Sequence, residues 1–237
     1  MLPKREFGKP GDFKVKSEAI QIPEGCTQVL LHACCAPCSS AIVEWLLQHG
    51  VKPTIFYYNP NIWPREEYEI RKEESKRHAN SLDIRWIDGD YSHDEWLDYV
   101  KICRGADTLD YDIAHEPERG RRCEQCFLLR LTVAARKAVE LGIPYFATTL
   151  ASSRWKNLDQ INRAGLLAEA IVNEEHKGSP THFWPQNWRK GGLQERRNQL
   201  LKEYAFYNQQ YCGCEFSRQD APRGNSKFEP GARSERH

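Results

Sequence analysis

The sequence lacks the features that would mark a membrane, secreted or strongly nucleic-acid-binding protein. It contains no run of about 18 apolar residues, the length that an ordinary transmembrane helix needs. Residues 1–23 are charged and contain no apolar core of signal-peptide length. The chain carries 34 basic and 33 acidic side chains, so its net charge is only +1 and a polyanion site must come from a local patch. We therefore expect a cytoplasmic protein with no membrane partner.

The order of apolar and charged segments predicts a single α/β domain. Short apolar runs alternate with longer amphipathic ones, which is typical of a parallel sheet with helices on both faces. We expect strands at residues 27–33, 52–58, 83–87 and 145–149. We expect helices at residues 39–49, 65–81, 93–103, 123–141, 157–173 and 193–208, with Ser152-Ser153 as a cap before the fifth. In such sheets, binding sites form at the carboxyl ends of the strands.

Three segments fall outside these regular elements. Residues 1–25 are rich in lysine and poor in apolar side chains, so we expect a flexible N-terminal arm. Residues 105–120 are acidic and are expected to form an irregular connection. Residues 218–237 are rich in Arg, Gly, Pro and Ser, which indicates a disordered tail. The predicted domain therefore spans residues 26–217.

Nine cysteines are many for a chain with no secretion signal. In a reducing compartment, clustered cysteines are more often metal ligands than disulfides. Cys26 and Cys103 stand alone in the sequence, and we leave them out of the site. The other seven fall into three groups: Cys34, Cys35 and Cys38; Cys123 and Cys126; Cys212 and Cys214.

The first group follows an apolar strand and precedes a helix. Pro37 suits the first turn of that helix, where its missing N–H costs little. Extended backbone should direct Cys34 and Cys35 to opposite faces. Cys35 and Cys38, three residues apart, should converge at the helix N-terminus, where the helix dipole favours thiolates.

The other two groups are chelating pairs. Cys123 and Cys126 open a predicted helix, and the preceding Arg121 and Arg122 are expected to lower their thiol pKa values. Cys212 and Cys214 flank Gly213, which permits a turn that directs both sulfurs inward. One four-coordinate metal site uses four thiols, so three of the seven remain for a second site. This count favours an iron–sulfur cluster beside a second metal with an open position, and zinc remains an alternative.

Other polar and aromatic residues could belong to the site, but each could also have an ordinary structural role. His32 is a possible ligand or proton donor, although a core histidine is the stronger interpretation. Aromatic residues after the second strand could stack on a base or simply pack in the core: Tyr57, Tyr58, Trp63 and Tyr68. An acid for protonating product could come from Asp88, Asp90, Asp107, Asp110 or Asp112. Local basic patches that could contact phosphate are formed by Arg119, Arg121, Arg122, Arg189, Lys190, Arg196 and Arg197.

Several unusual motifs occur together in a fixed order. They are His32-x-Cys34-Cys35-Ala36-Pro37-Cys38, Tyr58-Asn59-Pro60-Asn61-Ile62, Glu66-x-Tyr68, Gly89-x-Tyr91, Glu116-Pro117-Glu118-Arg119-Gly120-x-Arg122-Cys123-x-x-Cys126, Arg130-Leu131, Thr148-Thr149-Leu150-x-Ser152 and Tyr211-Cys212-Gly213-Cys214. Over residues 27 to 217 the chain resembles the QueH-type epoxyqueuosine reductases. The Trp155-Lys156 pair departs from that pattern.

The resemblance implies a Rossmann-like fold of the HUP or PP-loop type and a metalloenzyme. It implies reduction of epoxyqueuosine to queuosine at the wobble position of tRNA, the last step of tRNA queuosine biosynthesis. It implies a [4Fe–4S] cluster and an adjacent mononuclear iron, an epoxyqueuosine-bearing anticodon loop as partner, and an unidentified low-potential electron donor. The implied metal ligands are Cys34, Cys35, Cys38, Cys123, Cys126, Cys212 and Cys214, with Cys34, Cys35, Cys123 and Cys126 assigned to the cofactor. In some relatives Asp occupies the position of Cys38.

The chemistry agrees with these residues. Opening an epoxide to an alkene requires two electrons, two protons and loss of oxygen as water. No Gly-x-Gly-x-x-Gly segment is present to bind a nicotinamide or flavin dinucleotide as an alternative electron source. The wobble base lies in an exposed loop, so it can be recognised without melting a duplex.

Two other functions remain as alternatives. An iron–sulfur tRNA thiolase of the ATP-pyrophosphatase type would carry Ser-Gly-Gly-x-Asp-Ser after the first strand, where this chain has Cys-Cys-Ala-Pro-Cys-Ser. ATP dependence would favour that enzyme. A zinc-stabilised RNA-binding module would contain zinc, bind RNA and show no turnover.

Overall fold

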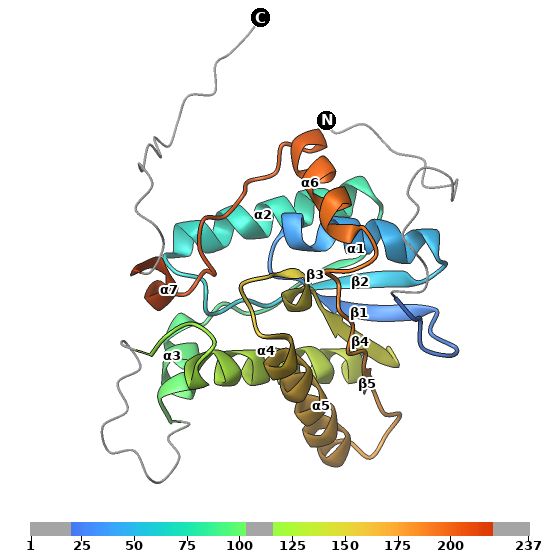
Figure 1. Ribbon diagram of the computed structural model, residues 1–237. Coiled ribbons are helices and arrows are strands. Elements are labelled where there is room, and N and C mark those ends of the chain that lie inside the picture. The colour runs from blue at the N-terminus through green and yellow to red at the C-terminus, as the bar shows by residue number, and fades with distance from the viewer. Residues whose placement is uncertain (1–19, 103–115, 220–237) are drawn as a thin grey trace, which may run out of the picture.

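A five-stranded parallel sheet forms the centre of the computed structural model, which describes residues 20–102 and 116–219 (Figure 1). Its strand order is β3-β2-β1-β4-β5, and all four strand pairs are parallel. The strands are β1 (Gln28–His32), β2 (Lys52–Tyr57), β3 (Trp86–Asp88), β4 (Tyr145–Thr148) and β5 (His182–Phe183). The prediction of a parallel α/β fold is therefore confirmed.

Helices cover both faces of the sheet (Figure 1). On one side lie α1 (Ala36–Gln48), α2 (Arg65–Ser81) and α6 (Leu193–Glu203). On the other side lie α4 (Arg121–Glu140) and α5 (Leu158–Glu175), with α3 (His93–Ile102) beside α4. A short 3₁₀ helix, η2 (Thr149–Ser152), follows β4, and α7 (Glu215–Gln219) lies at the end of the described chain.

The central strand explains why these layers form. Val29, Leu30 and Leu31 of β1 are completely buried because helices cover both sheet faces. A strand covered on both sides has an uninterrupted apolar sequence rather than an alternating one. In α1, Pro37 occupies the first turn, as expected. None of the described helices is long and apolar enough to cross a membrane.

The strand order reverses between β1 and β4, which makes their carboxyl ends the switch point of the sheet. Chain connections leave β1 and β4 toward opposite sides, so a crevice opens between them. His32 and Thr148 are paired at this end of the two strands. The first cysteine group follows β1 directly, so the fold places it beside the crevice.

Several element boundaries differ from the prediction for local reasons. β3 begins at Trp86, because Asp83 has a left-handed φ of 54° and the chain is still turning there. α6 ends at Glu203 rather than residue 208, since Ala205 also has a left-handed φ, of 50°. Neither β5, only two residues long, nor α7 was predicted.

The start of α5 was predicted with the wrong cap. The Asn157 side chain accepts hydrogen bonds from the backbone N–H groups of Asp159 and Gln160, so Asn157 is the cap residue. Ser152 instead ends η2. At the two ends of the described chain, Ile20 is only 4% exposed and belongs to the core, and α7 continues two residues into the predicted tail.

Buried His78 on α2 generates a prediction about pH. Burial, with a smaller contribution from Arg77, lowers the pKa of His78 from 6.5 to about 4. Its ring packs edge-on against Tyr204 and Phe206. Because the folded pKa lies below the unfolded one, its stabilising effect is present above pH 6.5 and is lost as the pH falls toward 4. Relative to His78→Gln, the wild type should lose about 3 kcal/mol of unfolding free energy across this window.

Denaturant unfolding at several pH values measures this difference. His176→Gln, at an exposed position, is the matched control and should keep the wild-type pH dependence. Equal pH slopes for the wild type and His78→Gln would show that His78 is not a buried neutral group.

Candidate metal centre

The three sulfurs of the first group converge at the carboxyl end of β1. The Sγ atoms of Cys34, Cys35 and Cys38 all lie within 4.8 Å of one another, and those of Cys34 and Cys35 are 3.8 Å apart. The convergence of Cys35 and Cys38 is confirmed. The predicted divergence of Cys34 and Cys35 is wrong, because Cys34 lies in a bend after the strand has ended. Strand alternation no longer applies there.

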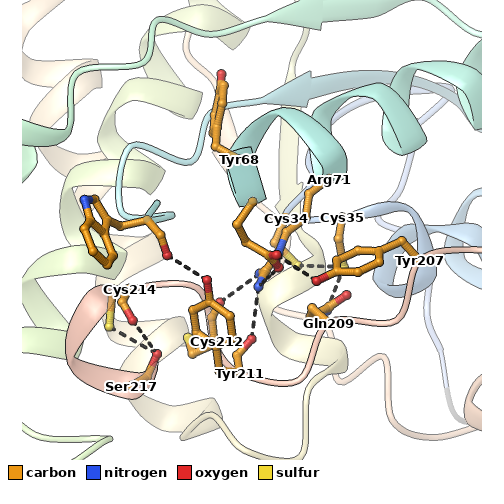
Figure 2. A network of polar contacts seen from close by, with 12 residues as sticks. Cys34, Cys35, Tyr68, Arg71, Tyr207, Gln209, Tyr211, Cys212, Cys214 and Ser217 are labelled. Atoms are coloured by element: carbon orange, nitrogen blue, oxygen red, sulfur yellow. Dashed lines mark hydrogen bonds and ion pairs between the residues drawn. The ribbon is translucent and has the colours of Figure 1, made fainter. Parts of the chain in front are cut away.

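Residues from other segments hold this group in place. The Cys34 backbone N–H donates to Thr149 Oγ1 across the switch point at 3.1 Å, and the Thr149 hydroxyl donates to Cys34 Sγ at 3.4 Å. From the C-terminal segment, Gln209 Nε2 donates to Cys35 Sγ at 3.0 Å and lies 3.7 Å from Cys38 Sγ (Figure 2). Sequence reasoning missed Gln209, because no spacing relates it to the cysteines.

The three thiols differ in their tendency to ionise. Hydrogen bonds from Cys35 and Cys38 hold the pKa of Cys34 well below its usual value, and Lys156 contributes in the same direction. Burial and the Cys34 thiolate raise the pKa of Cys35 well above normal. The hydrogen bond to Cys34 raises the pKa of Cys38 to about 11. Cys34 is therefore the first of the three to become a thiolate.

The second sulfur group combines the start of α4 with the C-terminal segment. Burial raises the pKa of Cys123 to about 12, and the charges of Cys212, Cys126 and Cys214 add to the effect. Burial and Cys212 likewise raise the pKa of Cys214 to about 11. The four sulfurs are thus close enough to interact electrostatically.

The expected lowering of the thiol pKa by Arg121 and Arg122 is wrong for Cys123. Arg122 is 1% exposed, and its guanidinium carbon lies 4.7 Å from the ring centre of Phe216 in α7. The Arg122 guanidinium thus faces an aromatic ring, and burial is the largest influence on the pKa of Cys123. The backbone N–H groups of both arginines donate to Glu116, at 2.6 and 2.7 Å, which fixes the start of α4.

Arg71 on α2 holds the C-terminal segment over the site (Figure 2). It is 2% exposed, and its guanidinium donates to the carbonyl oxygens of Tyr211 and Cys212, both at 3.2 Å. Glu67 accepts from Arg71 Nε at 2.7 Å and from the Tyr207 hydroxyl at 2.7 Å. This fork therefore determines where Cys212 lies.

Gly213 allows the chain to turn between the last two cysteines, as predicted. Its φ is +127°, and an added Cβ would meet Ile62 at 3.0 Å and Arg71 at 3.1 Å. Both the conformation and the space therefore require glycine. Beyond the turn, the Ser217 hydroxyl donates to the Cys214 carbonyl at 2.9 Å and anchors the start of α7.

Asn59 and Arg130 connect the two sulfur groups. Asn59 is completely buried, and its Nδ2 donates to the Ala33 carbonyl next to Cys34 at 2.9 Å. Its Oδ1 accepts from Arg130 Nη2, while Arg130 Nη1 lies 3.9 Å from Cys126 Sγ. Asn59 and Arg130 thus link the end of β1 to α4.

One cavity of about 460 Å³ opens onto both groups. Cys34, Cys38, Cys123 and Cys212 line it, so three distant segments share one pocket. Lys156 also lines it, and the thiolates of Cys212, Cys34 and Cys38 raise its pKa even though burial opposes its charge. None of the seven cysteines forms a disulfide. Thiolate ligands of this kind suit zinc, copper(I) and iron–sulfur clusters.

His32 has the structural role that was considered the stronger interpretation. Its Nε2 donates to the Tyr58 carbonyl at 3.0 Å, so its Nδ1 accepts from the Thr148 hydroxyl at 2.8 Å. Burial, with Arg130, lowers the pKa of His32 to about 3. The ring is therefore neutral and joins β1 to β4. Cys26 is a core residue, whereas Cys103 lies outside the described residues.

None of the aromatic and acidic candidates that the structure describes lines the cavity. Tyr57 and Tyr68 are at most 1% exposed and pack in the core, and Trp63 is 40% exposed outside the cavity lining. Asp88 pairs with Lys72 at 2.5 Å, and neither it nor Asp90 lines the cavity. The remaining aspartates, Asp107, Asp110 and Asp112, lie outside the described residues.

The predicted basic patches divide into buried residues, cavity-lining residues and exposed residues away from the cavity, such as Arg121 and Lys190. Arg196 of α6 pairs with Glu44 of α1 through two contacts of 2.8 and 2.9 Å, so it joins two helices. Arg119 and Arg197 line the cavity. Arg189 donates to the Lys156 carbonyl at 2.8 Å.

The Arg71 fork generates a prediction. Arg71→Lys keeps the charge but cannot reach two carbonyls and Glu67 together, so unfolding free energy should fall by about 2–4 kcal/mol. Amide hydrogen exchange should become faster in residues 209–214. Arg65→Lys, on the exposed side of α2, is the control and should change neither quantity. Unchanged exchange in Arg71→Lys would show that another contact fixes the segment.

Comparisons with known proteins agree with this geometry. Residues 29–220 match the family model described as epoxyqueuosine reductase QueH. The chain is 41% identical over 204 residues to epoxyqueuosine reductase QueH of Acinetobacter baylyi, covering 86% of each chain. It is 40% identical over 233 residues to that of Haemophilus influenzae, covering 96% of this chain and 89% of the relative. The protein of the same name from Thermotoga maritima is 37% identical over 194 residues, covering 80% and 89%. The chain belongs to the QueH family of epoxyqueuosine reductases.

Proposed function

We propose that the protein reduces epoxyqueuosine to queuosine at the wobble position of tRNA, the last step of tRNA queuosine biosynthesis. The observation that carries this proposal is the shared cavity at the switch point, onto which cysteines from three distant segments open in a member of the QueH family. Reduced thiols at this density suit the cytoplasm, where we place the activity.

The donor set fits an iron–sulfur cluster with a neighbouring iron. Five of the seven cysteines are buried and all seven are free, so sulfur is available on several sides of one cavity. A [4Fe–4S] cluster takes four thiolates, which leaves three for a second metal with an open position. When bound, these metals would supply single electrons and a Lewis acid for the epoxide oxygen.

We assign Cys34, Cys35, Cys123 and Cys126 to the cluster. Each pair lies at the start of a helix, α1 or α4, and Asn59 with Arg130 links the two helix starts. Helix N-termini favour the negative charge of thiolates. Cys38, Cys212 and Cys214 then remain for the adjacent iron. Lys156 stands near Cys38 and Cys212 and partly balances their charge.

The reaction balances with an external reductant. Both carbon–oxygen bonds of the epoxide break, a carbon–carbon double bond forms, and the oxygen leaves as water. Two electrons come from a low-potential one-electron donor protein, and two protons come from solvent. The chain's contribution is to bind the base in a cavity of about 460 Å³, which lies within the usual range for small-ligand sites.

Mass analysis of tRNA nucleosides tests the function. Metal-reconstituted protein, epoxyqueuosine-containing tRNA and a low-potential reductant should yield queuosine without ATP. A requirement for ATP would favour a thiolase-type enzyme. Stoichiometric zinc, tight RNA binding and no queuosine would favour an RNA-binding module.

Loss of a ligand to either of the two proposed metals should abolish turnover. Cys35→Ala, Cys126→Ala and Cys214→Ala should each deplete iron and reduce queuosine formation by at least about 10³-fold, since electron delivery has no other route. Cys26→Ala removes a buried cysteine outside the site and is the control, with near-normal activity and iron. Unchanged activity in any two of the three variants would contradict the assignment.

Sulfide analysis separates the two proposed metal sites. Cys38→Ala should lose part of the iron and keep the inorganic sulfide, whereas Cys126→Ala should lose both. Cys38→Asp offers an oxygen ligand that also suits iron and should regain the missing iron. Loss of sulfide in Cys38→Ala would instead place Cys38 among the cluster ligands.

A further inference from the structure

An exposed tryptophan stands at the cavity. Trp155, in the loop between η2 and α5, is 73% exposed, more than the other exposed large apolar side chains of the described chain, which are Trp63, Leu166 and Leu167. It is also the one of these four that lines the cavity shared by the two sulfur groups. Its ring is therefore accessible to a ligand that enters the cavity.

The loop is held rigidly although the indole is exposed. Arg119 donates from Nε to the Trp155 carbonyl at 2.9 Å and from Nη2 to the Arg154 carbonyl at 3.3 Å. Arg189 donates to the next carbonyl, that of Lys156, at 2.8 Å. Three successive carbonyls are therefore fixed, so a ligand would not have to order the loop on binding. Such preorganisation strengthens binding.

The same arginine fixes the loop relative to the sulfur site. The Arg119 backbone N–H donates to Cys123 Sγ at 3.3 Å, and its carbonyl accepts from Gln160 at 2.6 Å. Arg119 thus contacts a proposed cluster ligand with its backbone and the Trp155 loop with its side chain. The backbone that carries the indole therefore has a defined position with respect to Cys123.

The surroundings of Trp155 are positively charged although the whole chain is nearly neutral. The cavity lining contains Arg71, Arg119, Arg154, Lys156 and Arg197 and a single acid, Glu118. Glu67 neutralises Arg71, and the nearby thiolates offset the charge of Lys156. Arg119 and Arg197 donate to carbonyl and amide oxygens, contacts that leave their charge in place. The entrance therefore suits a polyanion.

An exposed aromatic ring among cations is the combination that binds single-stranded RNA, where a base stacks on the ring and phosphates contact the cations. We propose that Trp155 is the stacking platform for an unpaired anticodon-loop base beside the wobble nucleotide, and that Arg154 and Arg197 contact phosphates of the same strand. The inference rests on the proposed function, which places the wobble base inside the cavity. The neighbouring nucleotides must then lie at its entrance. An electron-donor protein, by contrast, has no group that must enter the cavity.

Binding of an epoxyqueuosine-bearing anticodon stem-loop to the metal-loaded protein tests this platform. Fluorescence anisotropy of labelled RNA should show affinity falling about 5- to 150-fold for Trp155→Ala, the range expected for loss of one stacked base. Trp155→Phe keeps an aromatic face and should remain within about threefold of wild type. Leu166→Ala, an exposed apolar residue outside the cavity lining, is the control and should bind normally. Iron and sulfide contents should match the wild type in all three variants.

Removal of the partner base makes the test specific. Stem-loops with an abasic site at each loop position should include one, beside the wobble nucleotide, that weakens wild-type binding but not Trp155→Ala binding. If every abasic site weakens binding by the same factor in the wild type and in Trp155→Ala, no loop base stacks on Trp155 and the inference is wrong. In a salt titration, Arg154→Gln should reduce the slope of log affinity against log salt by about 0.7, whereas Trp155→Ala should leave the slope unchanged.

The remaining outcomes distinguish this inference from the proposed function. If the wild type forms queuosine but Trp155→Ala binds the stem-loop normally, the platform is wrong and the function stands. If the wild type forms no queuosine but the abasic effect depends on Trp155, the function is wrong and the platform stands. If Trp155→Ala binds the stem-loop normally but is reduced more slowly by a protein electron donor, the surface around Trp155 belongs to that donor and the inference is wrong. Absence of any stem-loop binding would overturn both.

Discussion

The sulfur site depends on the return of the C-terminal segment across α2, and a buried guanidinium holds that segment there. Arg71 contacts two successive carbonyls of the segment and one carboxylate of its own helix. These contacts help to fix Cys212 and Cys214 relative to the cysteines after β1, together with the Trp63 N–H that donates to the Gly213 carbonyl at 2.8 Å. Gln209 completes the connection, because its amide reaches the sulfurs of Cys35 and Cys38 from the same segment. A charged group is stable in this interior because its N–H groups donate to two carbonyls and to a carboxylate.

The general fold and the grouping of the cysteines were predictable from the sequence. Apolar runs separated by amphipathic segments indicated the parallel sheet, and the sheet required a site at its carboxyl edge. The predicted start of β3 and end of α6 were wrong because Asp83 and Ala205 adopt a left-handed conformation. Residue composition does not predict such turns at non-glycine residues. The predicted orientation of Cys34 and Cys35 was wrong for a related reason, since the chain bends at Cys34, two residues before α1 begins.

Charged and amide side chains were the hardest to place. Arg71, Arg122 and Arg196 are all buried, but in the sequence they look like surface arginines. Their roles come from contacts between residues far apart in the chain, with Tyr211, Phe216 and Glu44 respectively. No local pattern records such pairings. The prediction of phosphate-binding patches was therefore too broad, and only part of the set borders the cavity.

The distance in sequence between the sulfur groups has a consequence for how the protein is made. Cys34, Cys35 and Cys38 leave the ribosome long before Cys214, and at ordinary translation rates the delay is about 10 s or more. During that interval the early thiols have no partners from the later segments. A metal centre that takes ligands from all three cysteine groups can therefore be completed only after the returning segment has been synthesised.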